Sequence, residues 1–106
     1  MRRSIDLRLY SEGRARFYAS DLEKLREMGL DYTKAQVFYN PEMVHNRDIA
    51  IAVLRRLGEG RSSIDCMAAS GVRALRFALE AGSSEVIAND NDPLAVAVVK
   101  KNISLN

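Results

Sequence analysis

Residues 63–90, SIDCMAASGVRALRFALEAGSSEVIAND, decide the fold class. Residues 63–67 and 85–88 are two short apolar runs, which predict two short strands. Residues 72–81 between them carry Val72, Leu75 and Leu79 at helical spacing, and Gly82 ends this helix. Two apolar strands joined by an amphipathic helix predict a parallel pair with a right-handed crossover.

The segment before this unit predicts a β-hairpin and a short helix. Residues 4–10 alternate, with Leu7 and Leu9 on one side and Arg8 on the other, and residues 14–18 alternate again after a turn at 11–13. Asp21 can cap a helix that runs through residue 28. We therefore expect an N-terminal unit at residues 1–34 and the first part of an open α/β domain at 35–106.

Two further helices flank the predicted strands. Asn40 and Pro41 are typical of an N-cap and a first helical residue, and this helix would run through residue 57. Asp92 and Pro93 start the last helix in the same way. The expected apolar stripes are Ile49, Ala52, Val53 and Leu57 on the first helix, and Ala95, Val98, Val99 and Ile103 on the last.

Composition favours a globular, cytoplasmic protein. The chain has 106 residues, 47% of them hydrophobic, and a net charge of +2, which excludes intrinsic disorder. No apolar run is long enough to span a membrane. One cysteine, Cys66, excludes an internal disulfide, and its apolar neighbours predict that it is buried. The only histidine, His45, has no companion ligand, so no metal site is expected.

Five arginines fall within the first sixteen residues, at positions 2, 3, 8, 14 and 16. Such an arm could contact phosphates, or it could simply be a solvated surface that keeps the domain soluble. The sequence does not separate these two interpretations.

The turn after the first strand is the candidate ligand site. Ser70 and Gly71 let a ligand approach the backbone at a helix N-terminus, and Asp65 in the strand could brace the loop. In open α/β sheets, ligands bind at the carboxyl ends of the strands. An ordinary tight turn is the alternative interpretation.

Asp90 ends the second strand, where an acid can accept hydrogen bonds from ribose hydroxyls. It could instead be a helix N-cap. Because the turn has a single glycine, Gly71, a dinucleotide is less favoured than a nucleoside cofactor without a pyrophosphate, such as S-adenosylmethionine.

Two arginines and one aromatic residue complete the candidate site. Arg73 lies in the first helical turn, where the helix dipole disfavours a cation, so we expect a carboxylate partner from a ligand or a nearby Asp. Arg47 lies on a mostly apolar helix face and should also have a partner, although either could be a surface arginine. Phe38 could stack on a base or act as a hydrophobic staple.

Three segments in order resemble one family, the tRNA guanine N2-dimethyltransferases, which methylate guanine 26 of tRNA. They are residues 37–54, VFYNPEMVHNRDIAIAVL; residues 68–80, AASGVRALRFALE; and residues 86–106, VIANDNDPLAVAVVKKNISLN, which ends in an Asn-x-x-x-Asn pattern. The resemblance implies a partial Rossmann-like methyltransferase domain of two parallel strands with helices after the hairpin, S-adenosylmethionine as cofactor and tRNA as partner.

The resemblance also implies roles for individual residues. Arg47, Arg73 and Asp90 match positions that bind S-adenosylmethionine, and Phe38 matches an aromatic residue in the pocket for the flipped-out guanine. The family's catalytic Asp belongs to an Asp-Pro-Phe/Tyr motif. Because Asp92-Pro93 is followed by Leu94, we expect that motif beyond residue 106 and the chain alone to be inactive. Another Rossmann-like methyltransferase, or a non-catalytic cofactor- or RNA-binding module, remains the alternative.

Overall fold

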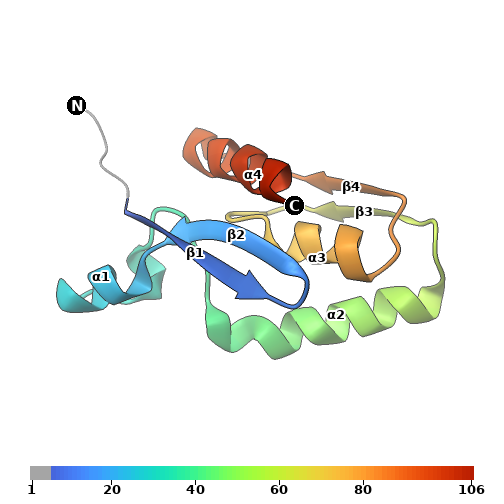
Figure 1. The fold of residues 1–106 in the computed structure, drawn as a ribbon, viewed down its shortest axis with the longest axis horizontal. Helices are drawn as coiled ribbons and strands as arrows, with labels where there is room; N and C mark the ends of the chain where they lie inside the picture. Colours follow the sequence, from blue (N-terminus) through green and yellow to red (C-terminus); the bar gives the residue numbers. More distant parts are fainter. Residues whose placement is uncertain (1–5) are drawn as a thin grey trace.

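The computed structural model describes residues 6–106 and confirms an α/β fold that follows an N-terminal hairpin (Figure 1). The predicted strand at residues 4 and 5, and the arginines at 2 and 3, lie outside the described residues. The strands are β1 (Leu7–Glu12), β2 (Ala15–Ser20), β3 (Ser62–Asp65) and β4 (Glu85–Ala88). The helices are α1 (Leu22–Glu27), α2 (Val44–Leu57), α3 (Val72–Glu80) and α4 (Pro93–Leu105), with 3-10 turns η1 (Tyr32–Lys34) and η2 (Pro41–Met43).

The predicted parallel pair is confirmed. β3 and β4 run parallel, with Ile64 opposite Ile87 and Asp65 opposite Ala88. Ser63 is buried toward α3, whereas Ile64 and Ile87 are 59% and 47% exposed on the other face. Both strands therefore end beside the turn that leads into α3, which is where the candidate site was expected.

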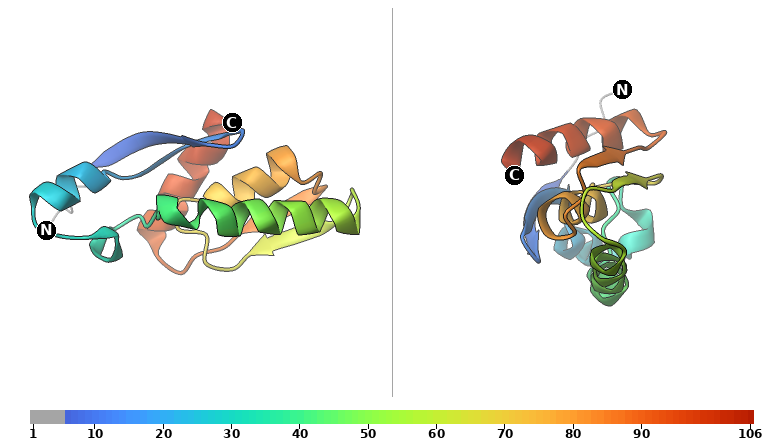
Figure 2. Two further views of the ribbon diagram at one scale, coloured as in Figure 1. Left: turned by 90° about the horizontal axis from the view of Figure 1, so that it is seen from below. Right: turned by 90° about the vertical axis from the view of Figure 1, so that its right-hand side faces the viewer.

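The hairpin packs onto the helices of the parallel unit. β1 and β2 pair antiparallel, and Ala15, Phe17 and Ala19 of β2 are buried in a cluster with Leu75 of α3 and Val98 of α4. Figure 2 shows the C-terminal end of α4 beside the hairpin. The predicted boundary between two units at residue 34 stays a prediction. The hydrophobic core contains residues from both sides of this boundary.

The inward face of β1 matches the expected one only at Leu7, which packs against the core. Tyr10 pairs with Phe17 and Glu12 with Ala15, so they share the buried side, whereas Leu9 is 41% exposed. Aromatic packing explains why the side of β1 that carries Tyr10 faces the core, because Tyr10 stacks on Phe17 with ring centroids 5.8 Å apart. A buried glutamate on this face is compensated by the ion pairs described below.

The apolar stripe predicted for α2 is wrong. Its members are exposed, with Ile49 at 65%, Val53 at 52% and Leu57 at 54% exposure, and Ala52 is exposed as well. Ile51 is buried instead, against Phe77 of α3. The buried line of α2 starts at Arg47, whose charge is neutralised by an ion pair, so hydrophobicity alone does not identify this face.

Three smaller predictions also need correction. The helix expected from Pro41 begins as the 3-10 turn η2, capped by Asn40, and becomes α-helical at Val44. In α4, Asn102 is fully buried and Ile103 is 57% exposed, because the Asn102 amide binds the hairpin backbone. Cys66 is exposed, since β3 ends at Asp65 and the cysteine lies in the turn that follows.

The helix caps were predicted correctly. Asp21 accepts hydrogen bonds from backbone N–H groups in the first turn of α1, and Asp92 does the same for α4. Within residues 6–106, no helix is long and apolar enough to cross a membrane. The same residues contain no cluster of three side chains that could hold a metal ion.

Candidate functional site

The turn between β3 and α3 is hydrogen-bonded to the tip of β4, and it has a positive φ at an alanine. Asn89 N donates to the Asp65 carbonyl at 2.8 Å, and Ala68 N donates to the Asn89 carbonyl at 2.8 Å. Ala69 has φ +50, a left-handed conformation that costs an L-residue about 1 kcal/mol. Asp90 stabilises it, because its Oδ2 accepts from Ala69 N at 2.9 Å. The acid predicted for ribose therefore lies directly against the turn.

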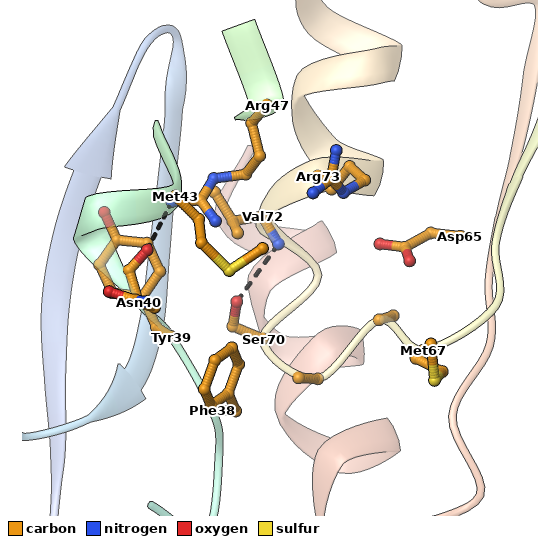
Figure 3. Close-up of a pocket in the computed structure, with 12 residues that line it drawn as sticks. Phe38, Tyr39, Asn40, Met43, Arg47, Asp65, Met67, Ser70, Val72 and Arg73 are labelled. Carbon is orange, nitrogen blue, oxygen red and sulfur yellow. Dashed lines mark hydrogen bonds between the residues drawn. The ribbon is translucent and has the colours of Figure 1, made fainter. Parts of the chain in front are cut away.

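Most of the predicted site residues line one pocket beside this turn (Figure 3). Phe38, Arg47, Asp65, Ser70 and Arg73 all contribute to its wall. The other lining residues are Tyr39, Asn40, Met43, Met67, Ala68, Ala69 and Val72. The pocket thus brings together the segment before α2, α2 itself, the end of β3 and the start of α3.

Asp90 and Gly71 lie around the turn rather than in the pocket wall. Asp90 contacts the pocket wall by accepting a hydrogen bond from the backbone N–H of Ala69, which lines the pocket. Its Oδ1 also accepts from Asp92 N at 3.0 Å. Gly71 has φ +85 and faces α4, where an added Cβ would lie 3.3 Å from Val99 Cγ2. A glycine here lets the turn pack tightly on α4.

Arg47 is clamped by the hairpin. Its Nε donates to Glu12 Oε2 at 2.7 Å, and its Nη2 donates to Glu12 Oε1 at 2.6 Å and to the Asn40 carbonyl at 2.9 Å. Its guanidinium carbon also lies 5.2 Å from the ring centroid of Tyr39. The partner expected for this arginine is therefore Glu12, a residue that the sequence analysis did not select.

Glu12 is the centre of a buried ionic cluster. Arg76 Nη1 donates to its Oε2 at 3.0 Å, and the Tyr39 hydroxyl donates to its Oε1 at 3.0 Å. Burial alone would raise the pKa of Glu12, but the hydrogen bonds and charge of Arg47, with those of Tyr39 and Arg76, lower it overall. Burial and the charge of Glu12 raise the pKa of Tyr39 to about 12, so Tyr39 stays a donor.

Arg76 also forms ion pairs with two further acids, Asp48 and Glu80. Its Nη2 lies 2.7 Å from Asp48 Oδ1, and its Nε donates to Glu80 Oε2 at 2.7 Å. Arg14 N also donates to Glu80 at 3.1 Å. The hydrogen bond from Arg76 lowers the pKa of Glu80. The cluster therefore connects the hairpin with α2 and α3 through charge-assisted bonds.

Arg73 lies beside Asp65 in the pocket, and Figure 3 shows the Asp65 carboxylate pointing toward it. Its hydrogen-bond partner is the amide of Asn46, because Nη2 donates to Oδ1 at 2.6 Å. Burial raises the pKa of the Asp65 carboxyl, and the positive charge of Arg73 opposes this rise. Asn46 was missed by the sequence analysis, since an asparagine on an exposed helical turn has no distinctive pattern.

Ser70 and Phe38 both line the pocket but differ in burial. Ser70 is 1% exposed, and its Oγ accepts from Val72 N at 3.3 Å, so the hydroxyl stabilises the turn that leads into α3. Phe38 is 37% exposed and meets Tyr32 edge-on with centroids 5.8 Å apart. An aromatic ring that is part of a pocket wall and still open to solvent is suited to stacking.

Two of the described arginines of the N-terminal arm bind protein groups through their side chains. Arg8 pairs with Glu23 at 2.8 Å on the surface, and Arg14 Nη1 donates to the Leu79 carbonyl at 2.7 Å. These contacts favour the surface interpretation for both residues over a free phosphate-binding arm.

Comparison with known sequences identifies the family. Residues 13–106 match the family described as N2,N2-dimethylguanosine tRNA methyltransferase. The chain belongs to this family. The part of the chain that matches this family begins at Gly13 in the hairpin turn, so it includes β2 as well as the parallel unit.

Named relatives and a solved structure agree with this assignment. The chain is 39% identical over 97 residues to the tRNA (guanine(26)-N(2))-dimethyltransferase of Metallosphaera sedula, covering 90% of the chain and 25% of that protein. It is 38% identical over 102 residues to the protein of the same name from Thermococcus kodakarensis, covering 96% and 25%. The chain thus spans about a quarter of the length of the curated relatives that it matches.

The structural similarity is also specific. The complex of Trm1 from Pyrococcus horikoshii with S-adenosyl-L-methionine superposes with a TM-score of 0.79 at 34% sequence identity. That superposition covers 94% of this chain and 24% of the other. The arrangement of hairpin, parallel strands and helices is therefore the one found in this enzyme family.

Proposed function

We propose that this chain forms the S-adenosylmethionine-binding part of a cytoplasmic enzyme that methylates the N2 amine of guanine 26 in tRNA. The observation that carries the proposal is the meeting of Arg47, Arg73 and Asp65 in one pocket beside the turn that Asp90 holds. The relatives' names and the S-adenosyl-L-methionine in the similar Trm1 complex support this choice of reaction and cofactor.

The donor groups fit the two ends of such a cofactor. Asp90 is an acid at the tip of the second parallel strand, where it can accept hydrogen bonds from ribose hydroxyls. Arg47 and Arg73 supply guanidinium N–H donors in the pocket wall, where they can hold a carboxylate. When bound, S-adenosylmethionine would supply an electrophilic methyl group on its sulfonium.

The role of the chain's own residues in this reaction is binding and orientation. Ser70 and Asp90 fix the turn, so that the ligand would meet a rigid backbone at the start of α3. Phe38 would stack on the guanine, which must leave the tRNA helix before its amine can react. The only Asp-Pro pair, Asp92-Pro93, caps α4, so neither residue is assigned a catalytic role.

Calorimetric titration of the chain with S-adenosyl-L-homocysteine tests the proposal. We expect saturable binding to the unmodified chain and an affinity about tenfold lower for Asp90→Asn, because the amide keeps an acceptor but loses the charge. Asp92→Asn is the matched control. It changes a neighbouring acid that caps α4, and its affinity should stay within about twofold.

Two results would contradict the proposal. No heat of binding with the unmodified, folded chain would exclude a cofactor site here. Equal affinities for the unmodified chain and Asp90→Asn would exclude the ribose role of Asp90.

A further inference from the structure

We propose that Glu12, on the hairpin, is a positioning residue that holds Arg47 in place for the carboxylate of the bound ligand. The inference rests on the proposed function, because it needs a ligand with an amino-acid end. Glu12 belongs to the N-terminal segment, which the sequence analysis treated as separate from the site. The hairpin would then be part of the binding machinery rather than only a cover for the core.

Glu12 and Arg47 form a buried, bidentate ion pair. Glu12 and Arg47 side chains are each 4% exposed, and two parallel hydrogen bonds of 2.7 and 2.6 Å join them. The bidentate arrangement fixes both the position and the plane of the guanidinium. A buried arginine without such a partner would adopt several rotamers or leave the site.

Glu12 leaves one nitrogen of the Arg47 guanidinium available as a donor. Nε and Nη2 of Arg47 bind Glu12 and the Asn40 carbonyl, and no hydrogen bond joins Nη1 to any group in residues 6–106. Arg47 also lines the pocket that contains Arg73 and Asp65. Nη1 is therefore the nitrogen of Arg47 that remains for a ligand carboxylate.

Glu12 is itself held in place by a second arginine. Arg76 Nη1 lies 3.0 Å from Glu12 Oε2. Arg76 is in turn bound by Asp48 at 2.7 Å and by Glu80 at 2.7 Å. Glu12 thus holds Arg47 by the edge of the guanidinium that does not carry Nη1, and Glu12 is also bound by a second arginine.

The test compares two ligands that differ in the amino-acid end. S-adenosyl-L-homocysteine has the carboxylate, whereas 5′-methylthioadenosine has the nucleoside and thioether without it. In Glu12→Gln, we expect the affinity for S-adenosyl-L-homocysteine to fall about tenfold and that for 5′-methylthioadenosine to stay within about twofold. A general loss of structure would weaken both ligands together.

Two variants make the result specific. Glu80→Gln is the matched control, because Glu80 belongs to the same cluster and binds Arg76 and Arg14 but not Arg47. It should leave the ratio of the two affinities unchanged. In an Arg47→Lys background, Glu12→Gln should have no further ligand-selective effect, since it acts through that arginine.

Outcomes separate this inference from the proposed function. If the unmodified chain binds neither ligand, both fail. If it binds both ligands and Glu12→Gln weakens them equally, the proposed function stands and the positioning role is wrong. A higher affinity of Glu12→Gln for S-adenosyl-L-homocysteine would also overturn the role, because Glu12 would then be a competing anion.

A measurement on the unmodified chain covers the case in which Glu12→Gln does not fold. Arginine side-chain NMR should show a slowly exchanging Nε–H for Arg47, because Glu12 holds it. The Nη signals of Arg47 should shift with S-adenosyl-L-homocysteine and not with 5′-methylthioadenosine. An Arg47 side chain that exchanges rapidly, or that ignores both ligands, would overturn the inference.

Discussion

Gly13 lies at the tip of the hairpin with φ +54, and it packs directly on the ionic cluster. A Cβ at this position would lie 2.6 Å from Nε of Arg76 and even closer to Glu80 Oε2. Gly13→Ala should therefore lower the free energy of unfolding by about 2–3 kcal/mol, through the left-handed backbone and the displaced ion pair. Denaturant unfolding at neutral pH measures this loss.

Gly29→Ala is the control for Gly13→Ala. Gly29 has φ +74, but no atom lies within 4 Å of an added Cβ. It should show only the backbone cost, about 1 kcal/mol. Equal losses at the two positions would mean that the contact with the cluster contributes nothing.

At the residue scale, the sequence predicted the strand tips better than the cluster. The positions of Asp90 and Ser70 at the turn could be predicted because strand ends and helix starts have local signatures, while their ligand roles stay predictions. Glu12 could not, since its partner Arg47 is 35 positions away and ion pairs carry no sequence period. The glutamate also follows residues whose alternation suggested the opposite face of β1.

At the scale of elements, α2 shows why periodicity can select the wrong face. Ile51 is 4% exposed and Ile49 is 65% exposed, although both lie on the same helix. Ile51→Ala should cost about 2–4 kcal/mol because it leaves a cavity against Phe77. Ile49→Ala, the same chemical change, should stay within about 0.5 kcal/mol. Thermal unfolding of both variants measures the two losses of stability. A larger loss for Ile49→Ala than for Ile51→Ala would mean that the face predicted from the sequence is the buried one.

The pairing of α4 with β2 explains the Asn-x-x-x-Asn pattern. Asn102 Oδ1 accepts from Tyr18 N at 2.7 Å, and its Nδ2 donates to the Tyr18 carbonyl at 2.9 Å. Asn106 makes the same two bonds with Arg16, at 3.0 and 2.6 Å. Positions four apart on a helix thus match positions two apart on a strand, and the amides substitute for a neighbouring strand at this edge.

Burial should separate the energetic contributions of these two asparagines. Asn102 is 0% exposed and also donates to the Ser70 carbonyl at 2.7 Å, so Asn102→Ala should cost about 2–4 kcal/mol by leaving buried backbone groups unpaired. Asn106→Ala, at an exposed position, should cost about 0.5–1 kcal/mol. Hydrogen exchange at the Tyr18 amide reports the first loss locally, and unchanged protection there would contradict this account.

At the scale of the whole molecule, the α/β class and strand order followed from the sequence, and the packing of the hairpin did not. Apolar runs, caps and helical spacing are local, so they predicted β3, α3, β4 and α4 closely. The contact between hairpin and helices depends on Phe17, Leu75 and Val98, which are distant in sequence. Such contacts are determined by the complete fold.

The ionic cluster joins the hairpin, α2 and α3, and it should make the stability of the protein depend on acid. The pKa values of Glu12 and Glu80 are lowered from their ordinary value of 4.5, so folding favours their charged forms. This contribution is fully present above pH 4.5 and is lost as the pH falls through the folded pKa values. Urea unfolding from pH 7 to pH 3 should show the decrease.

Glu12→Gln should flatten this acid dependence. At pH 7 the variant should be less stable than the unmodified chain by about 3 kcal/mol, because two buried arginines lose a charged partner. At pH 3 the difference should shrink, since Glu12 is then closer to neutral in both states. Glu27→Gln on exposed α1 should leave the curve unchanged. A difference for Glu12→Gln that stays constant from pH 7 to pH 3 would mean that shape, and not charge, explains the stability of this cluster.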